Sequence, residues 1–91
     1  MQDIPPDESL ITYPCEFPIK VMGLNVDGFT EAVISIAAQF DPTFGPHAVQ
    51  TRPSTAHKYL GVTVTITATS RAQLDELYRT LSTHPLVKMV L

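Results

Sequence analysis

The chain has 91 residues, a formal net charge of −3 and 44% hydrophobic residues. This length allows one compact domain, and this hydrophobic content is typical of a globular rather than a disordered chain. The acidic balance argues against a large basic surface for nucleic acid, the single cysteine excludes an intramolecular disulfide, and no apolar run approaches the roughly 20 residues of a membrane span.

Residues 1–14 are predicted to form a flexible lead-in to a single domain at residues 15–91. The lead-in is rich in proline and acidic residues, and proline removes backbone hydrogen-bond donors. The residues that we expect to dock its end onto the domain are Leu10, Ile11 and Tyr13. Because this beginning lacks the basic and apolar regions of a signal peptide, we expect a cytoplasmic protein that does not enter a membrane.

A first strand is predicted around residues 17–22, where Phe17, Ile19 and Val21 form one side of an alternating pattern. Pro18 lies inside this pattern and cannot donate a hydrogen bond to a neighbouring strand. One interpretation is that the strand lies at an edge of the sheet. We prefer the other, in which strand pairing begins after Pro18.

A turn at residues 23–28 (G-L-N-V-D-G) leads into the first predicted helix. Asp27 is expected to cap this helix, because its carboxylate can accept hydrogen bonds from the free N–H groups of the first turn. The helix has one apolar stripe with spacings of three and four, and Pro42 favours an end at Asp41. The stripe consists of Phe29, Val33, Ile36, Ala37 and Phe40.

The strongest strand pattern lies at residues 59–69, Y-L-G-V-T-V-T-I-T-A-T, and it predicts a central strand. A shorter strand at residues 48–52 precedes it and stops at Pro53. Gly61 indicates either a bulge or the close approach of another group. The side chains expected to face the core are Leu60, Val62, Val64, Ile66 and Ala68, with threonines on the other side.

Ser70 and Gln73 match a capping box, in which the serine accepts from the Gln73 N–H and the glutamine side chain reaches back. The second helix that follows carries an apolar stripe and ends at His84-Pro85. Residues 86–91 are the last predicted strand. The stripe consists of Leu74, Leu77, Tyr78 and Leu81.

The element order is therefore β-α-β-β-α-β, which predicts an α+β, ferredoxin-like fold. Right-handed crossovers in two split βαβ units give a four-stranded antiparallel sheet in the order 4-1-3-2. Both helices then lie on one face of the sheet.

Four segments resemble the YbeD-like family of small uncharacterised bacterial proteins. They are F-P-I-K-V-M-G (residues 17–23), Tyr59 followed by V-T-I-T-A-T (64–69), L-Y-x-x-L (77–81) and V-K-M-V-L (87–91). The resemblance covers residues 9–91 and implies a bacterial cytoplasmic protein. It also implies a fold similar to the ACT-type regulatory domain of amino-acid biosynthetic enzymes. It brings no enzyme activity and no catalytic residues.

The first candidate site is a ligand loop formed by Gly23, Asn25, Asp27 and Gly28. It loosely resembles the D-x-P-G-x-L turn with which ACT domains bind amino acids. A glycine lets a ligand approach the backbone, and helix N-terminal N–H groups suit a small carboxylate or amino acid. However, Asp27 would repel an anion and no proline precedes Gly28, so ordinary capping and turn chemistry is the competing interpretation.

The second candidate site is the threonine side of the predicted sheet, which is mildly apolar and weakly charged. Such a face suits association with a protein partner or a weak homodimer, and a plain solvated sheet is the alternative. It has no aromatic platform and only two lysines, which argues against RNA binding. Its expected residues are Lys20, Met22, Thr63, Thr65, Thr67, Lys88 and Val90.

No catalytic, cofactor or metal motif occurs in the sequence. The three histidines lack metal-ligand spacing, and Cys15 has no basic neighbour. We therefore expect a non-enzymatic regulatory or adaptor domain without a cofactor, which binds a small metabolite or a protein partner as a monomer or weak homodimer. The alternative is a structural interaction module that binds no small molecule.

Overall fold

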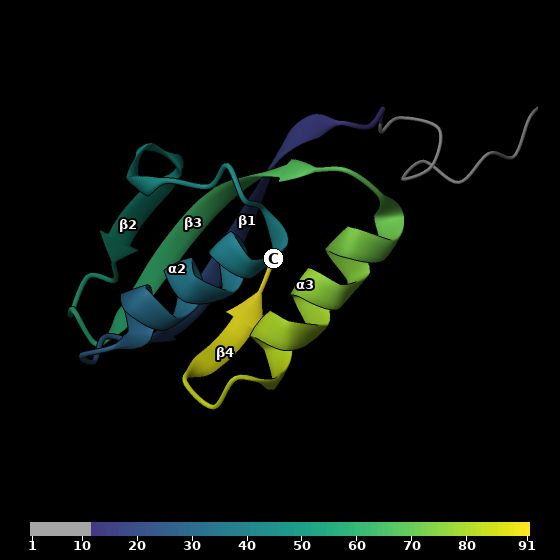
Figure 1. The fold of residues 1–91 in the computed structure, drawn as a ribbon. Coiled ribbons are helices and arrows are strands. Elements are labelled where there is room, and N and C mark those ends of the chain that lie inside the picture. Colours follow the sequence, from purple (N-terminus) through teal and green to yellow (C-terminus); the bar gives the residue numbers. More distant parts are fainter. Residues whose placement is uncertain (1–11) are drawn as a thin grey trace, which may run out of the picture.

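The computed structural model of the protein describes residues 12–91. Four strands form one antiparallel sheet, and two α-helices cover one of its faces (Figure 1). The strand order is β2-β3-β1-β4, which is the predicted order 4-1-3-2 counted from the other edge. The fold prediction is therefore confirmed. The elements are β1 (Cys15–Leu24), α2 (Phe29–Phe40), the 3-10 helix η1 (Pro46–Ala48), β2 (Val49–Pro53), β3 (Tyr59–Ala68), α3 (Arg71–Thr83) and β4 (Val87–Val90).

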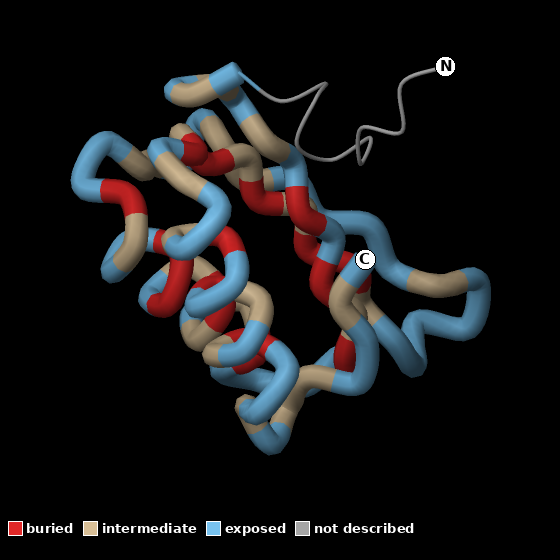
Figure 2. Tube along the Cα trace, turned by 90° about the vertical axis from the view of Figure 1, so that its right-hand side faces the viewer, coloured by how far each residue is buried: buried red, intermediate tan, exposed pale blue. Residues whose placement is uncertain are grey.

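The core lies between the sheet and the helices, and buried segments occur in both layers (Figure 2). The period of two in β3 and the helical stripes place their apolar side chains there, as predicted. Tyr13 packs against this core, whereas Leu10 and Ile11 lie outside the described residues. The buried hydrophobic residues are Ile19, Val21, Phe29, Val33, Ile36, Ala37, Val62, Val64, Ile66, Ala68, Leu74, Leu77 and Leu81.

Strand pairing begins before Pro18, so the prediction that it begins after this proline is wrong. β1 pairs with β3 from Cys15 opposite Ala68 onward. The Lys20 N–H donates to the main-chain oxygen of Leu91 (3.3 Å), and the Leu91 N–H donates to the Lys20 carbonyl (2.8 Å). Since hydrogen-bonding direction alternates along a strand, the nitrogen of Pro18 faces the same side as that of Lys20, away from β3. The missing donor therefore does not interrupt the β1–β3 pairing.

The prediction that Asp27 caps α2 is also wrong. Gly28 occupies the N-cap position with φ of 90°, and no side chain caps the helix. This left-handed conformation is one that glycine adopts without steric cost. Asp27 lies one residue before the cap and is exposed.

The start of α3 matches the predicted capping box. Ser70 Oγ accepts a hydrogen bond from the Gln73 N–H (3.0 Å), while Gln73 Oε1 accepts from the Thr69 N–H (2.7 Å). Gln73 Nε2 also donates to the carbonyls of Phe40 (2.8 Å) and Thr67 (3.2 Å). The glutamine side chain therefore joins the start of α3 to the end of α2 and to β3.

Replacing Ser70 by alanine is expected to lower the free energy of unfolding by about 1 kcal/mol, because one N–H at the start of α3 loses its acceptor. Urea unfolding followed by circular dichroism would measure this loss. Ser82→Ala, at an exposed position of the same helix, is the matched control and should leave the stability nearly unchanged. Equal midpoints for the two variants would show that Ser70 does not stabilise the helix start.

Candidate functional site

The side of the sheet away from the helices, called the outer face below, is the main candidate site. The two helices cover only the core face (Figure 1). Thr63, Thr65 and Thr67 lie half-buried on the outer face, since they alternate with the buried residues of β3. Lys20 is exposed opposite Thr63, and Met22 is half-buried opposite Gly61. The structure thus brings together five of the seven residues expected on this face.

β4 presents other side chains to the outer face than expected. Val90 lies opposite the buried Val21 and packs against the core, so its expected place on the outer face is wrong. Met89 lies opposite Met22 and is 53% exposed, and Leu91 is 61% exposed. The cause is the pairing register of β4, because a strand contributes alternate residues to each face. Lys88 is exposed at the register shift that separates the Met89 and Val87 pairings.

A hollow of about 470 Å³ lies on the outer face over Gly61. The register of β3 runs without a break along both β1 and β2, so Gly61 does not mark a bulge. Instead, a Cβ at Gly61 would lie 3.2 Å from Cε of Lys20, which confirms the close approach of another group. Arg52 lies opposite Gly61 on β2. The hollow is lined by Lys20, Gln50, Thr51, Arg52, Gly61 and Thr63.

A second hollow, of about 270 Å³, borders the buried carboxylate of Asp41. Its Oδ1 accepts hydrogen bonds from the Thr43 N–H (2.9 Å) and hydroxyl (2.6 Å), and its Oδ2 accepts from the Thr67 N–H (2.8 Å). Burial raises the pKa of this carboxyl, but the hydrogen bonds from Thr43 and Thr67 outweigh burial and hold the pKa below its usual value. The β2–β3 pairing ends at Val64, so β2 does not reach Thr67. Asp41 therefore supplies the hydrogen-bond acceptor that the Thr67 N–H needs at this edge of β3.

Sequence reasoning missed this role of Asp41 and assigned the residue only to the end of α2. The acceptor and its Thr67 donor are 26 residues apart, so no local spacing indicates the contact. The available signal was an acidic residue directly after an apolar helix stripe. The three hydrogen bonds occupy both carboxylate oxygens, so we assign Asp41 to structure and not to ligand binding.

The predicted ligand loop is partly used by the fold itself. Gly23 is buried in β1, and a Cβ there would collide with the Phe29 ring and the Leu86 carbonyl. The Asn25 N–H donates to the Lys58 carbonyl (2.9 Å), and Asn25 Nδ2 donates to the His57 carbonyl (3.1 Å). These two residues thus have packing and loop-joining roles, and a ligand at this loop stays a prediction.

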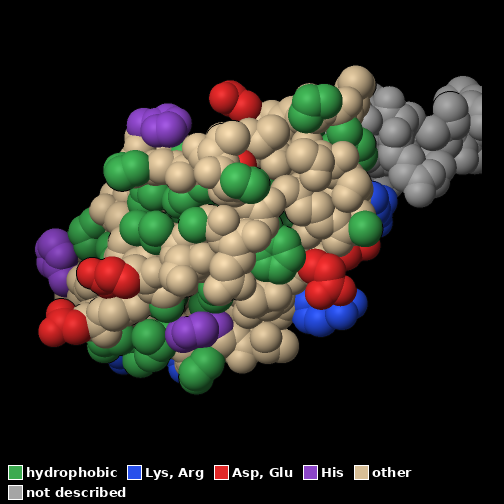
Figure 3. Space-filling view, viewed as in Figure 1, with side chains coloured by type: hydrophobic (Ala, Val, Ile, Leu, Met, Phe, Trp, Pro, Cys, Tyr) green, Lys and Arg blue, Asp and Glu red, His purple; other side chains and the backbone are tan. Residues whose placement is uncertain are grey.

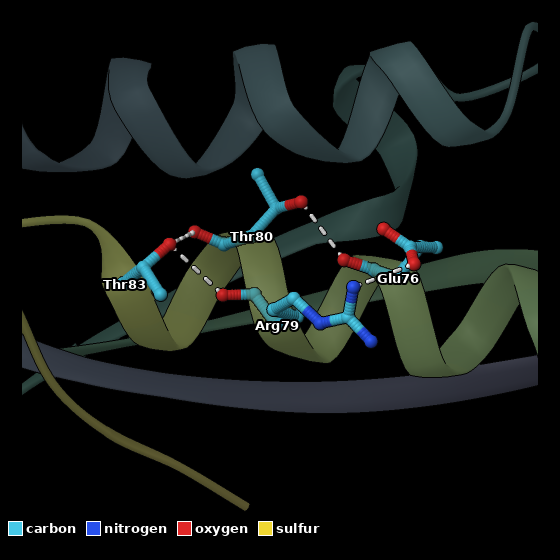
Figure 4. Close-up of polar contacts among 4 residues, drawn as sticks. All are labelled: Glu76, Arg79, Thr80 and Thr83. Atoms are coloured by element: carbon cyan, nitrogen blue, oxygen red, sulfur yellow. Dashed lines mark hydrogen bonds and ion pairs between the residues drawn. The ribbon is translucent and has the colours of Figure 1, made fainter.

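The exposed side of α3 offers few free groups. Arg79 pairs with Glu76 (2.9 Å), and the hydroxyls of Thr80 and Thr83 donate to backbone carbonyls one turn earlier (Figure 4). The helix side of the molecule shows scattered acidic side chains and histidines, with basic side chains at its margins (Figure 3). Within residues 12–91, no three His, Cys, Asp or Glu side chains form a group that could hold a metal. No helix in this part of the chain is long and apolar enough to cross a membrane.

Comparisons with known proteins identify relatives along the whole chain. A family model described as "Protein of unknown function (DUF493)" matches residues 8–91. A UPF0250 protein of Leptothrix cholodnii is 64% identical over 91 residues, and one of Bordetella pertussis is 54% identical over 91 residues, each covering 100% of both chains. The solution structure of protein HP0495 from H. pylori has a TM-score of 0.70 at 17% identity, covering 100% of this chain and 98% of that one.

Proposed function

The chain belongs to the DUF493 family of proteins of unknown function, and we propose from its surface that it is a non-enzymatic adaptor domain that binds a protein partner through its outer face. The membership confirms the resemblance to YbeD-like proteins, and the relatives in Leptothrix and Bordetella are bacterial. Within the proposal, the protein acts in the cytoplasm and regulates the partner that it binds.

The exposed apolar side chains of the outer face are the observation that carries this proposal. Met89 and Leu91 are more than half exposed, and Tyr59 is 39% exposed on the same side of β3 as the threonines. Exposed apolar residues that gather on one open sheet face are typical of protein interaction sites. The neighbouring threonines on β3 are uncharged, so removing this face from water costs less free energy than it would with charged side chains there.

A second proposal keeps the loop before α2 as a site for a small carboxylate or amino acid. It is supported by one observation, which is that no side chain caps α2. The Phe29 N–H donates to the Val26 carbonyl (3.3 Å), but the N–H groups that follow it in the first turn have no side-chain acceptor and could bind an anion. The exposed carboxylate of Asp27 one residue before the cap opposes this ligand, so we rank the outer face first.

Thr65→Asp is expected to abolish partner binding while the domain stays folded. The new charge would lie in the middle of the outer face, where a partner would remove it from water, but free protein leaves it solvated. Affinity purification from an extract of a bacterium that encodes this chain would measure which proteins copurify with wild type and are lost with the variant. Sedimentation of wild type and of Thr65→Asp at two concentrations would show whether a weak homodimer forms and whether the substitution prevents it.

Ser35→Asp is the matched control, because Ser35 is exposed on α2, on the opposite side of the sheet, and the substitution adds the same charge. It should keep every partner that wild type binds. If Thr65→Asp and Ser35→Asp retained the same proteins and the same sedimentation behaviour, the outer face would not be the interaction site.

A further inference from the structure

We infer that the protein partner presents an acidic segment to the outer face, with a carboxylate held over Gly61 between Lys20 and Arg52. This inference rests on the proposed function and adds the chemistry of the partner. It also assigns a role to the hollow over Gly61, which neither the core nor the capping contacts use.

Two cations flank the hollow because Gly61 has no side chain to separate them. Arg52 is directly opposite Gly61 on β2, and the Lys20 side chain approaches Gly61 from β1. Both residues line the hollow, together with the hydroxyl-bearing Thr63. A carboxylate at this position could pair with two positive charges and accept a hydrogen bond from a hydroxyl, which is a favourable arrangement for an oxyanion.

The two cations have no acidic partner among the described residues. Arg71 and Arg79 differ in this respect, since they pair with Asp75 (3.5 Å) and Glu76 (2.9 Å) on α3. On the outer side of the described strands the acidic side chain is Glu16, four residues before Lys20 on β1 and therefore about 13 Å away along the strand, while the main-chain oxygen of Leu91 accepts from the Lys20 backbone N–H. Unpaired positive charge thus gathers at the hollow in a chain whose formal net charge is −3.

Apolar side chains lie beside the hollow at regular spacing. Met22 and Met89 continue the row that runs from Arg52 through Gly61, at about 5 and 10 Å from Gly61 by strand spacing. Leu91 lies next to Lys20 and is exposed. Methionine adapts to the shape of an apolar partner. The complementary segment therefore has an acidic residue close to a large apolar residue, and the charge selects the partner.

Selection of short randomised peptides displayed on phage, with the full wild-type chain as bait, tests this inference. We expect the enriched peptides to carry aspartate or glutamate next to a large apolar residue. One enriched peptide is then synthesised and titrated into three proteins: wild type, Lys20→Gln/Arg52→Gln, and the control Arg71→Gln/Arg79→Gln. Both double variants change the net charge equally, but only the first one removes cations from the outer face.

Binding to Lys20→Gln/Arg52→Gln should be roughly tenfold weaker than to wild type, which corresponds to two exposed ion pairs. Binding to the control should change by less than about twofold. Enrichment without acidic residues, no enrichment at all, or equal loss in both variants would overturn the inference.

Amide chemical shifts with the bound peptide distinguish failure of the acidic-partner inference from failure of the proposed function. Shifts at Met22, Gly61 and Thr63 without any dependence on the two cations would leave the outer face as the site and reject the acidic partner. Shifts confined to the helices would reject both.

Discussion

Val64→Asp is expected to unfold the domain. Val64 is fully buried between Ile19 of β1 and Val49 of β2 on the core face of the sheet. A carboxylate there would have neither water nor a basic partner, and such a change costs roughly 4 kcal/mol or more. The total stability of a domain of this size is about 5 to 10 kcal/mol, so a loss of this size removes a large part or all of it, and the folded state should be strongly destabilised or lost. Circular dichroism and the dispersion of amide resonances would measure this loss.

Thr65→Asp is the matched control, because it introduces the same side chain at the adjacent position of the same strand. Thr65 points to the outer face, where water solvates the charge. We therefore expect Thr65→Asp to keep a cooperative thermal transition close to that of wild type. A cooperative transition in Val64→Asp would contradict the assignment of the two faces of β3.

Asp41→Asn is expected to lower the free energy of unfolding at neutral pH by about 2 kcal/mol, because an asparagine retains one acceptor oxygen where the aspartate has two. The Thr43 and Thr67 N–H groups donate to different carboxylate oxygens, so one of them would face the NH₂ group of the asparagine. Urea unfolding at neutral pH would measure the difference. Asp75→Asn, at an exposed ion pair on α3, is the control and should cost much less.

The stability difference between wild type and Asp41→Asn should also depend on pH. The pKa of Asp41 is lower in the folded protein than the ordinary value of an aspartate. Its ionised form therefore stabilises the fold above the unfolded-state pKa of about 4, and this contribution is lost as the pH falls through the folded-state pKa. The gap between the two proteins should accordingly narrow in acid. A gap that stays constant from neutral to strongly acidic pH would mean that the Asp41 carboxylate does not contribute through its charge.

The alternation of β3 gives the domain a useful separation of roles. One side of the strand carries the core and the other side carries the proposed interaction site. Substitutions at Thr63 and Thr65 can therefore test binding without loss of the fold, whereas those at Val62 and Val64 test the fold. The loop before α2 does not allow this separation, because its residue Gly23 is also needed for packing against Phe29.

The sequence by itself determined the four strands, the two α-helices, their order and the strand order of the sheet, but not the 3-10 helix η1. These follow from short-range patterns: the period of two in β3, the stripes of α2 and α3, and the capping residue Ser70. The element order then limits the topology, because crossovers are right-handed and short. The outer face was predictable in part for the same reason, since the threonines of β3 alternate with core residues.

Only the tertiary structure decided the features that depend on pairing between distant segments. Pro18 lies within a paired strand because its nitrogen points away from β3, and no local pattern indicates that direction. The side of Val90 depends on the register of β4, whose mostly apolar sequence has no alternation to reveal it. The Asp41 contact and the approach of Lys20 to Gly61 join residues far apart in the chain. Local propensity carries no information about such contacts, because they form only when the strands and loops have been placed in one register.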